Sequence, residues 1–153
     1  MDLPLGYLFR DLDDDQLKRI AAVAREIPME KGQQICREGE EAKELYILKT
    51  GAVELMTKVE HDVELPISIL RKPGDIFGAG VLVAPYQYAL TARCAGKGVL
   101  FSIKRSAIQK LMMEDRDLGC IIMTNLAAHF LGRLKESRRE IKVHFSTLLR
   151  SYS

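Results

Sequence analysis

The residues best suited to chemistry lie in a stretch of low charge, from position 74 to position 95. Between Asp75 and Arg93 there is no charged side chain, although 29% of the whole sequence is charged. A glycine-rich turn, an apolar pattern typical of a short helix and a strand-like segment follow one another there. Backbone N–H groups at such a helix start bind small anions. The stretch therefore predicts the outline of an anion-binding site.

The histidines of the chain do not indicate catalysis. His61, His129 and His144 do not combine with carboxylates into the ligand set that a metal-binding cupin-type enzyme requires. No pair of a nucleophile and a base can be drawn from the sequence either. We therefore predict no catalytic residue and no metal site, and we expect that the protein is not an enzyme. An enzyme on a double-stranded β-helix stays open as an alternative of a different class.

Bulk composition indicates one globular domain over residues 1–153, with 47% hydrophobic residues. The net charge of +2 makes no case for a nucleic-acid or membrane partner. Three cysteines without CxxC spacing predict reduced thiols rather than a disulfide framework or a zinc site. The N-terminus lacks the pattern of a signal peptide, and Pro85 interrupts the charge-free run. We therefore expect a cytoplasmic protein without a membrane span.

The elements that must position the low-charge stretch begin with an N-terminal helical segment, residues 1–26. Asp13 and Gln16 have the spacing of a capping box, and apolar residues follow at helical intervals. This pattern predicts a helix from about Asp14 to Arg25, ended before Pro28.

From residue 27 to residue 104 the period changes to that of short strands. Turn signals recur every roughly 8–12 residues, which is typical of an antiparallel sandwich or barrel. The expected strands are Ile27–Met29, Gln34–Cys36, Leu45–Lys49, Val53–Lys58, Pro66–Arg71, Tyr88–Ala95 and Gly98–Lys104.

Residues 105–153 return to a helical pattern. Ile108 and Leu111 suit a short helix that ends near Glu114, and a longer helix is expected to begin around Asp117. The apolar spacing continues more weakly beyond Ser137. The order of elements predicts a mainly β domain with flanking helices.

Three motifs carry a resemblance to a known family. They are KGQQICREGE at 31–40, ELYILKTGAV at 44–53 and PGDIFG at 73–78. With them the chain resembles the cyclic-nucleotide-binding domains of catabolite-activator-type regulators, cyclic-nucleotide-dependent kinases and gated channels. The resemblance implies a double-stranded β-helix (jelly roll) with an N-terminal helix and C-terminal B and C helices. It also implies a regulatory or sensor module.

The resemblance makes residues 74–95 the phosphate-binding cassette of such a domain. Glycines at 32, 39, 51 and 74 would then turn the chain between strands with positive φ. The predicted ligand pocket consists of the cassette and one residue of the long helix that would face the purine. Its candidate residues are Phe77, Gly78, Ala79, Gly80, Val81, Leu82, Tyr88, Ala89, Leu90 and Ser137.

Three positions of the cassette depart from the family pattern. Ala79 stands where a glutamate normally accepts from the ribose hydroxyl, Tyr88 where an arginine pairs with the phosphate, and Ala89 where a Ser or Thr adds a hydrogen bond. Losing the arginine–phosphate pair costs about 2–5 kcal/mol, and losing the sugar contact costs about 1–3 kcal/mol more. We therefore expect weak binding of cAMP or cGMP and name no certain cofactor. Tyr88 itself could fill the phosphate space.

Three further residues near or beyond the cassette have an expected role. Arg93 lies on the opposite face of its strand from Tyr88, so we expect a surface role rather than a replacement anion contact. Cys94 is expected to fill the core. His129 is expected to be partly buried or at an interface, with a haem ligand as the alternative.

The long helix suggests how the domain assembles and what it lacks. In the family this helix pairs with its two-fold mate, and the apolar run Leu118–Leu134 is predicted to form a homodimer seam. No helix-turn-helix is expected after Ile141, so no direct nucleic-acid contact is predicted. Two alternatives stay open: an excised ligand-sensing domain of a catabolite-activator-type transcription regulator, and a haem or redox sensor on the same fold.

Overall fold

The computed structural model describes residues 2–152 and begins with a short 3₁₀ turn, η1 (Tyr7–Phe9), and helix α1 (Asp14–Val23). Both halves of the predicted capping box are present. The Asp13 carboxylate accepts from the Gln16 N–H at 2.8 Å, and the Gln16 side chain accepts from the Asp13 N–H at 3.0 Å. The helix ends earlier than predicted because Ala24 already begins a strand that pairs with Ile103.

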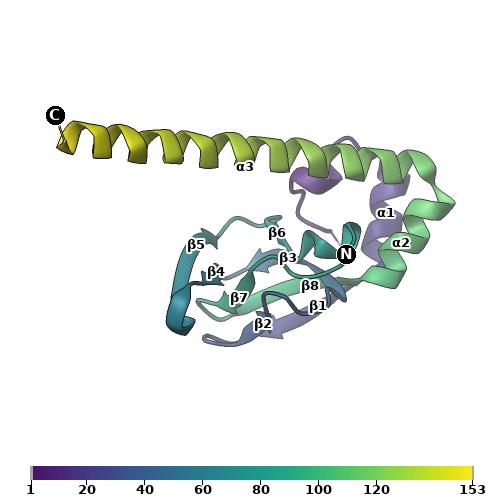
Figure 1. The fold of residues 1–153 in the computed structure, drawn as a ribbon. Coiled ribbons are helices and arrows are strands. Elements are labelled where there is room, and N and C mark those ends of the chain that lie inside the picture. Colours follow the sequence, from purple (N-terminus) through teal and green to yellow (C-terminus); the bar gives the residue numbers. More distant parts are fainter. Residues whose placement is uncertain (1, 153) are drawn as a thin grey trace.

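Eight strands form two antiparallel four-stranded sheets, in the orders β1–β8–β3–β6 and β2–β7–β4–β5. Figure 1 shows the strands gathered into one roll, with the helices on one side of it. The predicted fold class, a β jelly roll with flanking helices, is confirmed. The strands are β1 (Ala24–Met29), β2 (Gln34–Cys36), β3 (Glu44–Thr50), β4 (Val53–Lys58), β5 (Glu64–Leu70), β6 (Ile76–Phe77), β7 (Thr91–Cys94) and β8 (Gly98–Lys104).

The predicted glycine turns all have the expected backbone conformation. Gly32, Gly39, Gly51 and Gly74 have φ values between 85° and 97°. At Gly74 space is limiting as well, because a Cβ there would lie 2.7 Å from the carbonyl oxygen of Leu5. The turn before the cassette is therefore tied to the N-terminal segment that crosses it.

Strand β7 is shorter than the sequence predicted, since the expected strand began at Tyr88 and the observed one begins at Thr91. The preceding residues pair with another segment instead. The Ala42 N–H donates to the Tyr86 carbonyl at 2.7 Å, and the Tyr88 N–H donates to the Glu40 carbonyl at 2.9 Å. This pairing draws the inner end of the cassette toward the start of β3.

Two helices complete the chain. Helix α2 (Arg105–Glu114) leads directly into α3 (Arg116–Ser151), a single helix of 36 residues. The first turns of α3 pack into the core, where Leu118 and Ile122 are fully buried. In Figure 1 the yellow end of α3 extends past the roll. Of the helices in residues 2–152, none has the length and apolar character needed to cross a membrane.

Candidate functional site

A small cavity lies inside the roll, beneath the middle of α3, and has a volume of about 130 Å³. Its walls come from β2, β4, β6, the cassette, the N-terminal segment and α3. The lining residues are Tyr7, Cys36, Leu55, Ile76, Phe77, Gly78, Ala79, Gly80, Tyr88, Ala89, Leu90, His129, Phe130 and Arg133.

The predicted short helix of the cassette is a single 3₁₀ turn, η3 (Ala79–Leu82), and two glycines fix its position. Gly78 has φ = 80°, and a Cβ there would lie 2.9 Å from the Glu44 carbonyl oxygen and 3.2 Å from the Tyr88 ring. A Cβ at Gly80 would lie only 2.2 Å from the Gln87 carbonyl oxygen. The turn therefore packs backbone against backbone, and its path depends on glycine at both positions.

Tyr88 projects into the wall of this cavity and is 7% exposed. Its hydroxyl donates to the Glu44 carbonyl oxygen at 3.0 Å and accepts from the N–H groups of Glu44 and Lys43 at 3.1 and 3.3 Å. These bonds join the cassette to the first residues of β3. Tyr88 is therefore held in one position by groups that are themselves fixed in the sheet.

The titratable groups inside the roll stay neutral near neutral pH. Burial raises the pKa of Tyr88 and of its neighbour Tyr46. Burial also raises the pKa of the Cys36 thiol to about 12, so this cysteine is an inert lining group rather than a nucleophile. The part of the cavity formed by the roll thus presents no charge to a ligand.

Residues from the two ends of the chain cover the cavity. The rings of Tyr7 and His129 stack with their centroids 3.7 Å apart. The Asn125 amide donates to the carbonyl oxygens of Leu8 and Arg10 at 3.0 and 2.8 Å, which holds the N-terminal segment under α3. Arg133, one turn beyond His129, adds the only charged side chain of the lining.

The cover has a positive electrostatic character. Burial lowers the pKa of His129, and the nearby Arg133 charge lowers it further, against an opposite effect of Glu136. Burial raises the pKa of Tyr7 to about 12, while the Arg133 charge acts in the opposite direction. Arg133 therefore lies close enough to act on both stacked rings.

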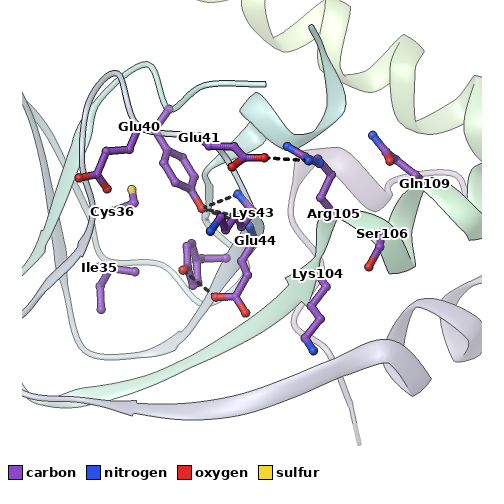
Figure 2. Close-up of a pocket in the computed structure, with 12 residues that line it drawn as sticks. Ile35, Cys36, Glu40, Glu41, Lys43, Glu44, Lys104, Arg105, Ser106 and Gln109 are labelled. Carbon is purple, nitrogen blue, oxygen red and sulfur yellow. Dashed lines mark hydrogen bonds and ion pairs between the residues drawn. The ribbon is translucent and has the colours of Figure 1, made fainter. Parts of the chain in front are cut away.

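A second, open hollow lies on the other side of Tyr88, between β2, the start of β3 and the start of α2 (Figure 2). It has a volume of about 900 Å³. In Figure 2 Arg105 points toward Glu41, with which it pairs at 3.1 Å, and it also donates to the Ala42 carbonyl at 2.9 Å. Tyr88 and Cys36 line both hollows and so separate the small cavity from the open one.

The structure brings most of the predicted pocket residues together. Phe77, Gly78, Ala79, Gly80, Tyr88, Ala89 and Leu90 all line the small cavity. Val81 instead lies fully buried in the core, and Leu82 packs against the core without lining the cavity. Ser137 is exposed on α3, where it lines a separate surface groove with Ile141 and Phe145.

The cover residues Tyr7, His129 and Arg133 were not predicted as pocket residues. A signal was present for two of them, since positions 118, 122, 126, 129 and 133 form one stripe of a helix with 3.6 residues per turn. The stripe was interpreted as a dimer seam rather than as a surface that packs on the roll.

The expectations for residues around the cassette are confirmed. Arg93 is at the surface and forms a two-pronged ion pair with Glu64 at 2.8 and 2.9 Å. Cys94 is 2% exposed and lies in the core. His129 is partly buried, as predicted.

Comparison with known proteins agrees with this geometry. A family model described as "Cyclic nucleotide-binding domain" matches residues 26–115. The chain belongs to the cyclic nucleotide-binding domain family. The regulatory or sensor module predicted from the motifs is confirmed at that level.

Individual relatives of this cyclic nucleotide-binding domain are more distant. The Anaerobic regulatory protein of Bacillus subtilis is 22% identical over 91% of this chain and 60% of its own length. The Catabolite Activator Protein of Thermus thermophilus has the same fold, with a TM-score of 0.77 and 23% identity over 90% of this chain and 62% of that one. A Geobacter metallireducens protein proposed to bind cyclic nucleotides is 31% identical, with a TM-score of 0.70 over 83% of this chain and 91% of that one. The chain thus spans about 60% of the length of the first two relatives.

Proposed function

We propose that this chain is a non-enzymatic regulatory domain in which the cyclic-nucleotide site is altered, so that cAMP and cGMP bind only weakly. The observation that supports this most directly is Tyr88. Its ring takes up space in the cavity wall where the family pattern has the phosphate-binding arginine, and three hydrogen bonds hold it there. A ligand that needed this space would have to displace a buried and fully bonded side chain.

Size and charge support the same proposal. Sites for drug-sized ligands have volumes of roughly 300–1,000 Å³, whereas this cavity has about 130 Å³. The roll-derived part of the lining carries no charge. A phosphate placed there would lose its hydration without a counter-charge, which is costly in an apolar environment. Together with the losses at Ala79 and Ala89, a micromolar ligand would bind at roughly millimolar concentration or worse.

The domain is also proposed to act as a homodimer through the distal half of α3. From Leu134 onward every described residue of this helix is exposed. Isolated helices shorter than about 12–15 residues are marginal in water, so a projecting helix of this kind needs a partner. Apolar side chains repeat along it at intervals of three and four residues, typical of a coiled-coil seam. The seam positions are Leu131, Leu134, Ile141, Phe145 and Leu148, with Arg138 at one further position.

This seam differs from the one that the sequence predicted. Leu118, Ile122 and Leu126 belong to the predicted run but are at most 2% exposed within one chain. Because they pack on their own roll, they are unavailable to a partner. Only the last turns of the predicted run, from Phe130 to Leu134, remain free, and the proposed seam continues from there toward the C-terminal end.

Calorimetric titration of cAMP and of cGMP into the purified domain tests the altered site. The expected result is no saturation at ligand concentrations up to the millimolar range. A dissociation constant in the micromolar range for either nucleotide would contradict the proposal, because it would require Tyr88 to yield its position at little cost. The proposal covers this domain, and the activity of any larger assembly that contains it follows from the ligand it binds.

A further inference from the structure

The small cavity has features that point to a ligand class of its own, and this inference rests on the proposal that cyclic nucleotides bind only weakly. We propose that it binds a small monocyclic aromatic carboxylate, with the ring inside the roll and the carboxylate on Arg133. Benzoate is the simplest member of this class. Size, lining and charge support the inference separately.

The volume suits a single six-membered ring. An engineered apolar protein cavity of about 150 Å³ stays dry and binds benzene, and the cavity here has about 130 Å³. A bicyclic base joined to a sugar and a phosphate needs far more room. A ring of benzene size therefore matches the space without movement of Tyr88.

The inner walls favour an apolar body. Leu55, Ile76, Phe77 and Leu90 contribute aliphatic and aromatic surface. The polar groups of the roll that reach the cavity already have partners: the Tyr88 hydroxyl bonds to Glu44, and the Cys36 thiol lies 3.8 Å from the Leu90 carbonyl oxygen. No free polar group of the roll is thus left to bind a hydroxyl or an amide deep in the cavity.

The cover supplies the group that would select an anion. Arg133 lines the cavity, is only partly exposed, and forms no ion pair with any of residues 2–152. A guanidinium binds a carboxylate through two parallel hydrogen bonds, which a neutral ligand cannot reproduce. The Tyr7 hydroxyl, which has no hydrogen bond among the described residues, is a second donor on the same cover.

Titrations followed by ¹H–¹⁵N NMR at pH 7.5 test this inference with benzoate, benzamide and benzene as probes. Benzoate is expected to bind at least roughly tenfold more tightly than benzamide, because charge-assisted hydrogen bonds are about twice as strong as neutral ones. The Arg133→Gln variant should lose this difference. Arg139→Gln, an exposed position on the same helix, is the matched control and should keep it.

A second variant separates the ring site from the charge. Ala79→Leu adds a branched side chain to the cavity wall and should weaken benzoate and benzene alike, while Arg133 stays in place. The inference is overturned if benzoate does not bind, if it binds no more tightly than benzamide, or if its preference survives in Arg133→Gln. cAMP titrated into the same samples distinguishes the two proposals. Micromolar cAMP binding refutes the proposed function, whereas weak cAMP binding with no benzoate binding refutes the carboxylate inference alone.

Discussion

At the scale of single residues, Tyr88 determines what the cassette can accept. Its hydroxyl satisfies three backbone groups of Lys43 and Glu44, and its ring separates a small inner cavity from a large open one. A side chain with this many bonds is part of the fold as well as part of the site. Changes at this position should therefore affect stability and ligand selection together.

Removing only the hydroxyl of Tyr88 tests its structural role. Tyr88→Phe should lower the free energy of unfolding by about 1–3 kcal/mol, because buried N–H and C=O groups lose their partner. Urea denaturation followed by circular dichroism measures this. Tyr86→Phe is the matched control, since the Tyr86 ring lies 5.2 Å from Arg105 and its hydroxyl has no hydrogen bond among the described residues. Equal effects of the two variants would contradict the role given to Tyr88.

His129 should make the stability of the cover depend on pH. Its pKa is lowered by burial first and by the Arg133 charge second, while Glu136 acts in the opposite direction. The unfolded chain therefore binds a proton more readily than the folded one. The contribution of His129 to stability is complete above its ordinary pKa of about 6.5 and is lost as the pH falls below that value.

Urea denaturation at pH 7.5 and at pH 5.5 measures this dependence. His129→Gln removes the Tyr7 stack and should lower stability at pH 7.5, but it should lose less on acidification than the wild-type protein does. His144→Gln, at an exposed position of α3, should acidify like wild type. An unchanged difference between the two pH values in His129→Gln would refute this explanation.

At the scale of elements, the cassette turn depends on the absence of side chains. Gly80→Ala should lower the free energy of unfolding by about 1–3 kcal/mol or more, because its Cβ would collide with the Gln87 carbonyl at 2.2 Å. Gly132→Ala is the control, since its Cβ would meet nothing within 4 Å and it replaces a mid-helix glycine. That variant should gain up to about 1 kcal/mol. Two changes of the same kind are thus expected to have opposite signs.

The elements whose signals are local were predictable from the sequence. β2, β4, β8 and α2 occur where alternation, turn glycines and helical spacing indicated them. The two-residue strand β6 was not predicted, because Ile76 and Phe77 are too few to show a period. The pairing of Tyr86 and Tyr88 with the segment before β3 was also missed, since it depends on residues far away in the sequence.

The candidate site shows the same division. The cassette residues were predicted because one continuous segment carries them. The cover was not, because Tyr7 and His129 meet only after the two ends of the chain pack together. The stripe on α3 that reaches the cavity has the same helical period as a dimer seam, so its sequence alone could not decide between the roll and a second copy.

At the scale of the whole molecule, α3 has two different faces. The positions that pack on the roll and the proposed seam lie on roughly opposite sides of a helix with 3.6 residues per turn. A ligand under the cover would contact the first face without touching the second. The same helix could therefore connect the cavity to the assembly of two chains.

The seam predicts a selective effect on association. Ile141→Glu should shift the protein from dimer to monomer in sedimentation velocity experiments, because it places like charges against each other in the seam. Val143→Glu changes an equally exposed apolar residue that lies off the seam and should leave the dimer intact. A monomeric wild-type protein, or equal effects of both variants, would contradict the proposed dimer.

The altered cyclic-nucleotide site is tested most directly by one calorimetric comparison. cAMP is titrated into the wild-type domain, into the triple variant Ala79→Glu, Tyr88→Arg, Ala89→Ser, and into Tyr88→Ala, which opens space without adding charge. The triple variant is expected to bind at least roughly tenfold more tightly than wild type, and Tyr88→Ala is expected to gain little. Micromolar binding by the wild-type domain, or no gain in a folded triple variant, would contradict the claim that these three residues set its weak affinity.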